Sequence, residues 1–291
     1  MNDVTDDSPH DLRAWIGRRE EATDIIAPMR IAEMNATLDR DDPFPRGGDT
    51  VAPLYHWMFA AFLGLVRTSE LGPDGHPRRG GFLPPVRLPR RMWAASDVTF
   101  HNDLCVGDTV TRRAEVEAIE EKSGRSGALT FVTVRHDYEG PSGPALTDRQ
   151  TIVYREAPAD SERGKAPETK PAPSDGTFAR RLTPDINMLF RYSALIFNAH
   201  RIHFDQPFVT GTEGYPDLVV HGPLIATLLA DLVRRERPRA RIARLGFRAA
   251  APLFAGRAMT VAGKDVPDGL ALWAADDRGG LCARADVILK G

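Results

Sequence analysis

Residues 219 to 235 read VVHGPLIATLLADLVRR, and this run decides the fold of the second half of the chain. Pro223 suits the first turn of a helix, where a missing amide hydrogen leaves no helical carbonyl unpaired. The apolar side chains after it recur at helical spacing on one wide stripe: Leu224, Ile225, Leu228, Leu229 and Leu232. The pattern therefore predicts a helix that is largely buried.

Strand-like runs follow this helix and are separated by short Gly and Asp turns. They cover residues 241–256, 257–266, 269–279 and 280–290. A shorter helix is predicted before residue 197, with Thr183 as its cap, Pro184 in its first turn and the apolar residues Ile186, Leu189, Phe190, Ala194 and Phe197. Helices followed by an antiparallel meander indicate an α+β unit whose sheet wraps around a helix.

The first half of the chain repeats this order of elements. Residues 50–66, TVAPLYHWMFAAFLGLV, predict a helix in which Ala52-Pro53-Leu54 corresponds to Gly222-Pro223-Leu224. Strand-like runs follow over residues 92–120, 127–140 and 145–156. Two such units can pair their sheet edges into one continuous sheet, which protects both edges, and a tandem duplication supplies both units in one chain.

A segment with the composition of a linker separates the two halves. Residues 156–176, EAPADSERGKAPETKPAPSDG, are rich in Pro, Ala and charged residues and almost free of large apolar ones. We therefore predict an N-terminal unit over 1–155 and a C-terminal unit over 177–291. Residues 39–48 and 69–91, which are rich in Gly, Pro and Arg, have no counterpart in the second half and are expected to be surface loops beside a cleft.

The composition is that of an ordinary globular protein. Of the 291 residues, 42% are hydrophobic and 27% are charged, and the net charge is −2. We therefore expect neither a nucleic-acid partner nor a membrane span, and the acidic start without an apolar run predicts a cytoplasmic location. Cys105 and Cys282 lie far apart, which favours reduced thiols over a disulfide. Whether the chain forms a homo-oligomer stays open.

The segment between the two predicted helices concentrates polar chemistry. Residues 197–224, FNAHRIHFDQPFVTGTEGYPDLVVHGPL, hold three of the eight histidines. The pattern His-x-Asp-x-Pro at 203–207, followed by VHGPL at 220–224, resembles the hydratase-2 motif of MaoC-type enoyl-thioester hydratases, which have the hot-dog fold. Residues 88–108 narrow the resemblance to the double-hot-dog branch, which contains mesaconyl-C4-CoA hydratases and type 2 hydroxyacyl-thioester dehydratases.

The resemblance extends to single residues, with departures at three positions. The family pattern Asp-x-Asn-Pro-x-His contains the catalytic Asp and His. His203 matches that His, whereas Asn198 stands where the Asp is expected, and His200 and Arg201 replace Asn-Pro. The resemblance implies a double hot-dog enzyme without a cofactor that hydrates a 2-enoyl-CoA or catalyses the reverse reaction, with mesaconyl-C4-CoA, giving citramalyl-CoA, as the preferred substrate.

The residues of this segment suit that chemistry. Hydration needs a base for the proton of water, an acid for C2 and donors for the enolate oxygen. His203 titrates near neutral pH, and Asn198 can hold a water molecule but cannot take its proton. Asp205 would support His203 if the segment is extended, or would cap the next turn. His221 and Gly222, at a helix start with free amides, are expected to bind the thioester.

Other interpretations stay open. A single histidine is often structural, the same fold suits an acyl-CoA thioesterase, and the missing Asp also fits a non-catalytic acyl-CoA-binding protein. A dehydratase of fatty-acid metabolism is a further alternative. His200 and His203 are spaced as metal ligands, but no Cys or carboxylate set completes a site, so no metal is expected. Arg90, Arg91 and Arg248 are candidates for contacts with CoA phosphates, or are ordinary surface residues.

Overall fold

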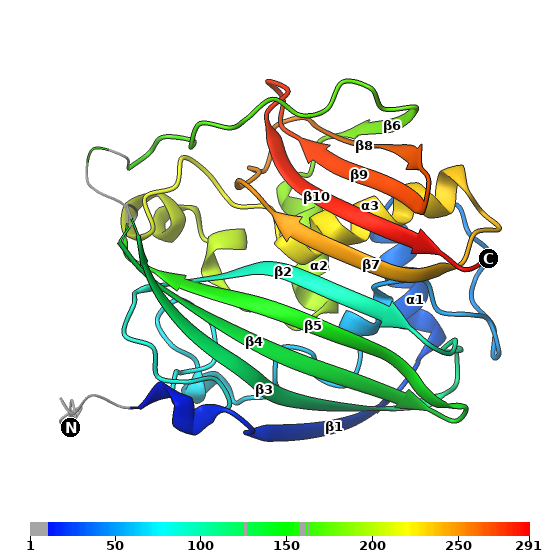
Figure 1. The fold of residues 1–291 in the computed structure, drawn as a ribbon, viewed down its shortest axis with the longest axis horizontal. Helices are drawn as coiled ribbons and strands as arrows, with labels where there is room; N and C mark the ends of the chain where they lie inside the picture. Colours follow the sequence, from blue (N-terminus) through cyan, green and yellow to red (C-terminus); the bar gives the residue numbers. More distant parts are fainter. Residues whose placement is uncertain (1–10, 125–126, 158–160, 162) are drawn as a thin grey trace.

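The computed structural model describes residues 11–124, 127–157, 161 and 163–291. The acidic start at residues 1–10, and residues 158–160 and 162 of the predicted linker, lie outside the described residues. The strands form one antiparallel sheet in the order β1-β3-β4-β5-β2-β7-β10-β9-β8-β6 (Figure 1). Five strands come from each half, and the order of the second half mirrors that of the first, as predicted for two units joined edge to edge.

The two halves have matching successions of elements. The first half contains β1 Arg19–Ile25, α1 Pro28–Thr37, β2 Arg90–Phe100, β3 Thr109–Gly124, β4 Gly127–Gly140 and β5 Gly143–Arg155. The second half contains β6 Phe178–Leu182, α2 Ile186–Leu195, α3 Gly222–Glu236, β7 Ile242–Ala249, β8 Met259–Val266, β9 Gly269–Ala275 and β10 Leu281–Leu289. A strand therefore forms within each predicted run, but the run at 92–120 is divided into β2 and β3, and β1, α1 and β6 were not predicted.

The halves meet where β2 pairs with β7. The register runs from Ala95 opposite Arg248 to Thr99 opposite Arg244 and centres on Asp97 opposite Gly246. Arg244 also donates from Nε to Oδ1 of Asp97 at 2.7 Å across this junction. The pairing satisfies the backbone groups that an unpaired edge strand would expose.

Helix α3 is the buried helix predicted from residues 219–235. Its apolar stripe is inaccessible, with Leu224 and Leu229 at 0% exposure, and it contacts strands of the second-half sheet. In Figure 1 the helix lies against one face of that sheet. Burial of a leucine side chain contributes about 1.5–3 kcal/mol, so this stripe is a main source of stability for the half.

The prediction of a helix at residues 50–66 is wrong. Only a short 3₁₀ turn forms, Tyr55–Met58, and Ala60 and Ala61 then adopt left-handed backbone conformations with φ of 52° and 50°. The buried Arg112 explains the break, because its guanidinium donates to the carbonyl oxygens of Ala60 at 2.7 Å and Ala61 at 3.0 Å. A side chain thus satisfies carbonyls that a continuing helix would have bonded to its own amides.

Helix α2 forms, but its cap and its apolar face differ from the prediction. Asp185, rather than Thr183, caps it by accepting from the Met188 amide at 2.8 Å. Phe190 and Phe197 are 65% and 64% exposed instead of packed in the core. Phe197 follows the helix with φ of 53°, and both rings line the cavity described below.

The two cysteines and the helices bear on the predictions of reduced thiols and of no membrane span. Cys105 and Cys282 are free, as predicted, and burial raises the pKa of Cys282 to about 12. No helix within the described ranges is both long and apolar enough to cross a membrane.

Candidate active site

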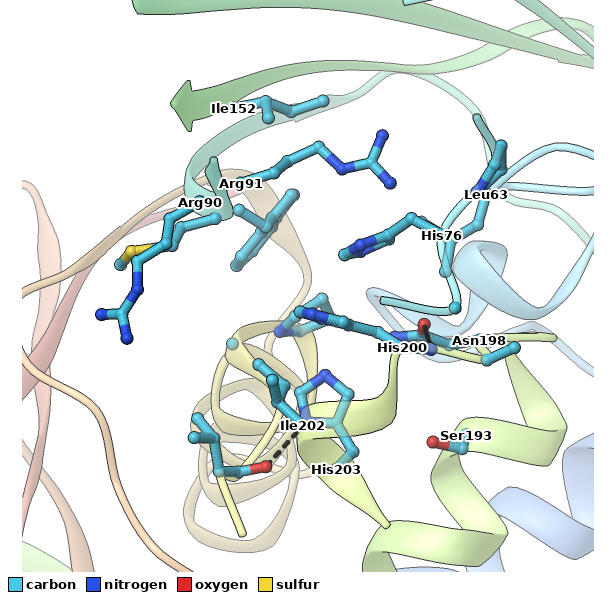
Figure 2. Close-up of a pocket in the computed structure, with 18 of the residues that line it drawn as sticks. Leu63, His76, Arg90, Arg91, Ile152, Ser193, Asn198, His200, Ile202 and His203 are labelled. Atoms are coloured by element: carbon cyan, nitrogen blue, oxygen red, sulfur yellow. Dashed lines mark hydrogen bonds between the residues drawn. The ribbon is translucent and has the colours of Figure 1, made fainter. Parts of the chain in front are cut away.

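A cavity of about 1900 Å³ is lined by residues from both halves. The first half contributes parts of the loop after residue 61 and of β2, β4 and β5, and the second half contributes residues 190–204 and the start of α3. Sites for drug-sized molecules usually have about 300–1,000 Å³, so this cavity suits a longer, extended ligand. Parts of the polar segment identified in the sequence, including Asn198, His200 and His203, border it (Figure 2).

His203 lies on the wall of this cavity with a fixed tautomer. It ends a 3₁₀ turn, Arg201–His203, so the segment is not extended as one interpretation required. Its Nδ1 is 2.7 Å from the carbonyl oxygen of Val219, which can only accept, so Nδ1 carries the proton and Nε2 keeps its lone pair. Burial lowers the pKa of His203 to about 4, although the bond to Val219 opposes the shift. His203 is therefore a neutral base at pH 7.

His221 supports His203 from behind instead of lining the cavity. The two rings stack with centroids 3.6 Å apart, and Nε2 of His221 lies 2.8 Å from Oγ of Ser193. His221 is fully buried, and burial, followed by the charge of His203, lowers its pKa well below the usual value. The predicted thioester contact of His221 is therefore not supported, because His203 and Ser193 occupy its surroundings.

Asn198 lies on the cavity wall near the two histidines of the motif. Its Oδ1 accepts from the backbone amide of His200 at 2.9 Å, and its own backbone amide donates to Ser193 at 2.8 Å. Because Oδ1 is held, the side-chain amide group is left to donate toward the cavity. An amide can position water there but cannot accept its proton.

Asp205 has structural contacts and does not border the cavity. Its Oδ2 accepts from Arg201 at 2.7 Å, and its Oδ1 accepts from the Phe208 amide at 3.0 Å. The Arg201 hydrogen bond, helped by the Phe208 amide, lowers the pKa of Asp205. These contacts fit the interpretation that Asp205 caps the next turn. They do not fit the interpretation that Asp205 supports His203.

Gly222 begins α3 on the cavity wall, as the sequence predicted for a thioester contact. Within the described chain, its amide has no hydrogen-bond acceptor, and the next residue, Pro223, has no amide hydrogen. A Cβ at Gly222 would lie 2.9 Å from Cε3 of Trp93, which belongs to β2 of the other half. The helix start thus offers a free donor and partial positive charge to a ligand in the cavity.

His200 has partners that the sequence did not reveal. Its ring contacts that of His76 at a tilt of 37°, with the centroids 3.8 Å apart, and meets His203 edge-on at 5.3 Å (Figure 2). Nδ1 of His76 lies 2.9 Å from Oδ2 of Asp74. Asp74, His76 and His200 each offer one ligand atom within 4.8 Å of the others, so a carboxylate and a second histidine that the sequence did not place there lie beside His200, and the expectation of no metal stays a prediction.

Comparisons with known proteins agree with this geometry. The family description of hydroxyacyl-thioester dehydratase type 2 matches residues 54–255. The chain is 43% identical to a mesaconyl-C(4)-CoA hydratase of Chloroflexus aurantiacus over 85% of this chain and 86% of the relative. The chain belongs to the hydroxyacyl-thioester dehydratase type 2 family. Its members are named as hydratases and dehydratases, so the chain is a hydro-lyase.

More distant relatives of the type 2 dehydratase family support the same fold. A mitochondrial type 2 hydroxyacyl-thioester dehydratase of Schizosaccharomyces pombe is 27% identical over 82% of this chain and 87% of its own length. A solved MaoC-like dehydratase superposes with a TM-score of 0.72 at 16% identity, covering 96% and 99% of the two chains. A Mycobacterium tuberculosis protein described as a double hot-dog fold gives 0.57 at 14% identity over 94% and 96%. The predicted double hot-dog fold is confirmed.

Two neighbouring arginines of β2 lie at the cavity of this chain. Arg90 and Arg91 line it, whereas Arg248 does not. Arg90 stacks over Tyr215 at 4.8 Å and lies 3.3 Å from Glu213. Nε of Arg91 is buried and has no hydrogen-bond partner among the described residues. The two neighbours therefore differ, because Arg90 has a carboxylate beside it and Arg91 offers a donor without an acceptor.

The sequence pointed to the second half and missed Asp74 and His76 of the first. Both belong to the stretch 69–91, which was predicted only as a loop beside a cleft. The available signal was the Asp-Gly-His spacing at 74–76 within that stretch, since an Asp two residues before a His can orient its ring. Nothing in the local pattern indicated that this loop would reach His200.

Proposed function

We propose that the chain adds water reversibly across the double bond of a 2-enoyl-CoA, with mesaconyl-C4-CoA, giving citramalyl-CoA, as its preferred substrate. The observation that carries the proposal is the pairing, in one cavity, of a neutral His203 with a free amide at Gly222. A base and an oxyanion donor are the two groups that this addition requires.

His203 acts as the base that activates water. Its protonated Nδ1 is held by the carbonyl oxygen of Val219, so Nε2 takes the proton as the water oxygen bonds to C3. The resulting imidazolium keeps its bond to Val219 and is stabilised by it. A positioned histidine contributes about 10²–10⁴-fold to such a step.

Gly222 stabilises the charge that develops on the thioester oxygen. The electrons of the double bond move to that oxygen when water adds, and the amide at the start of α3 donates to it. The helix dipole adds partial positive charge at the same place. The side-chain amide of Asn198 positions the water opposite His203.

Arg91 supports a substrate whose acyl group has a free carboxylate, as in mesaconyl-C4-CoA. Its charge acts on Asp74 and His200, so it lies close to the motif, and its Nε has no partner among the described residues. Hydrogen bonds to charged groups contribute about 1.5–3 kcal/mol, which is enough to favour a dicarboxylic acyl group. The identity of 43% to a mesaconyl-C(4)-CoA hydratase points the same way.

The alternative is a 3-hydroxyacyl-thioester dehydratase of fatty-acid metabolism. It is favoured by the match of residues 54–255 to hydroxyacyl-thioester dehydratase type 2 and by the size of the cavity, about 1900 Å³. The two functions share the reaction and differ in the acyl group. A long apolar chain would pack against apolar lining residues such as Phe62 and Ile152 and would leave Nε of Arg91 without an acceptor.

The test is a panel of thioesters followed by ultraviolet absorbance of the enoyl group and by product mass. Mesaconyl-C4-CoA, crotonyl-CoA and a long-chain 2-enoyl-CoA separate the substrates. We expect the highest kcat/KM with mesaconyl-C4-CoA and a product that gains one water and keeps CoA. Arg91→Gln should lower kcat/KM for mesaconyl-C4-CoA about ten- to a hundredfold and that for crotonyl-CoA less than about threefold. Release of free thiol would indicate a thioesterase, and unchanged absorbance a binding protein.

A further inference from the structure

The proposed hydration uses two proton positions, the water that adds to C3 and the carbon C2. The family places an Asp beside its catalytic His, but this chain has Asn198 at that position, and an amide cannot carry the second proton. The cavity wall beside the motif contains another ionisable group, His76. Contacts of the surrounding residues hold both the loop that contains His76 and its ring in place.

The loop that contains His76 is fastened to the motif by its backbone. The amide of Arg201 donates to the Asp74 carbonyl at 2.9 Å, and Nη1 of Arg201 donates to the Pro73 carbonyl at 2.9 Å. Gly75 has φ of +86°, and a Cβ there would lie 1.8 Å from the carbonyl oxygen of Ala199. Only glycine permits this close approach. The loop tip therefore holds Asp74 and His76 in a defined place against the motif.

The same loop orients the ring of His76. Oδ1 of Asp74 accepts from the His76 amide at 3.0 Å, while Oδ2 lies 2.9 Å from Nδ1 of the ring. A carboxylate only accepts, so Nδ1 is the donor and Nε2 is left for the cavity. Burial raises the pKa of Asp74, while Arg91 and Arg79 oppose the shift. Figure 2 places His76 on the opposite side of His200 from His203.

We propose that His76, positioned by Asp74, is a second catalytic acid–base residue of this site and supplies the proton for C2. The inference rests on the proposed hydration. It means that the first half contributes chemistry, as well as walls, to a site whose motif lies in the second half.

The proton transfers balance as follows. Nε2 of His203 takes one proton from water as the oxygen bonds to C3, and the electron pair of the double bond moves onto the thioester as an enolate. Nε2–H of the His76 imidazolium then donates its proton to C2, which restores the thioester carbonyl. His203 releases its proton to solvent and His76 takes one up, so the net change is the addition of one water.

A metal ion is the competing use of the same side chains, since two histidines and a carboxylate form a zinc-type donor set. Asp74, His76 and His200 have suitable atoms within 4.8 Å of one another. The direct bond between Asp74 and His76 favours proton transfer, because Nδ1 of His76 and one carboxylate oxygen already satisfy each other. Chelation decides between the two in the experiment below.

The experiment measures kcat and KM of His76→Ala, Asp74→Asn and Gly75→Ala with the enoyl-CoA that wild type hydrates best. We expect kcat to fall at least about fiftyfold in His76→Ala with KM within about threefold, and imidazole added to the buffer to restore part of it. Asp74→Asn should lower kcat about tenfold or more and move the pH profile, because it changes the orientation of His76. Gly75→Ala should lower kcat by displacing the loop tip.

His101→Gln is the matched control, because His101 is exposed and does not line the cavity, and it should retain wild-type rates. If His76→Ala fails to fold, His76→Gln and Asp74→Asn give the same test. Retention of kcat within threefold in folded His76 variants of an active wild type overturns the inference. Loss of wild-type activity on chelation, restored by Zn²⁺, overturns it in favour of a metal. A wild type that hydrates no enoyl-CoA refutes the proposed function instead.

Discussion

The pKa of His203 allows a quantitative prediction. Burial lowers it to about 4, whereas an ordinary histidine titrates near 6.5, and the difference corresponds to about 3 kcal/mol. At pH 5 a base with a pKa near 4 is about nine-tenths neutral, while one near 6.5 is only about 3% neutral. If His203 is the base, loss of its neutral form should therefore lower kcat/KM at pH 5 by no more than about 20% relative to pH 7.

The assay should use the crotonyl thioester of pantetheine, which has neither a carboxylate nor a phosphate that titrates in this range. A phosphate monoester, such as that of CoA, titrates near pH 6 and would obscure the profile. Circular dichroism at each pH checks that the protein is folded. The acidic limb of kcat/KM reports the free enzyme, so a midpoint near 6.5, or a thirtyfold loss at pH 5, would refute the assignment of a buried, neutral His203 as the base.

Three further predictions concern single substitutions. Asn198→Ala should lower kcat about ten- to a thousandfold with little change in thioester binding, and Asn198→Asp should shift the pH profile; unchanged kinetics in both would remove Asn198 from the site. Gly222→Ala should lower kcat/KM at least about tenfold in steady-state assays, because its Cβ would lie 2.9 Å from Trp93; wild-type kinetics would argue against a close approach there. Burial lowers the pKa of His136 to about 3, so its contribution to the free energy of unfolding is present above pH 6.5 and is lost as the pH falls toward 3. His136→Gln should therefore weaken the pH dependence of urea unfolding by about 4–5 kcal/mol over that range, and an unchanged dependence would contradict the assignment.

Helix α3 and the strands could be predicted because their signals are local. A leucine repeat at helical spacing is buried wherever the helix packs, and alternating runs between turns form strands in almost any sheet. The mirrored sheet order followed from the repeated order of elements. The helix expected at 50–66 has the same local signal, but Arg112, far along the chain, bonds the carbonyls of Ala60 and Ala61 and ends it.

The sequence predicted those site residues that lie together in the segment 197–224. Asn198, His203 and Gly222 lie on the cavity wall because the turn and the start of α3 place them there. The roles of His221 and Asp205 could not be predicted, because they depend on Ser193, which contacts Nε2 of His221, and on Arg201, which donates to Oδ2 of Asp205. The predicted boundaries at residues 155 and 177 and the homo-oligomer stay predictions.

The left-handed turn at Ala60 and Ala61 has a consequence for how this protein can change. Where the second half packs a helix against its sheet, the chain of the first half turns away, and Phe62 and Ile152 face the cavity instead. Variation in these lining residues alters the room for the acyl group without touching His203 or Gly222. The room for the acyl group and the positions of His203 and Gly222 therefore depend on different residues, so the substrate range can change while these two groups keep their geometry.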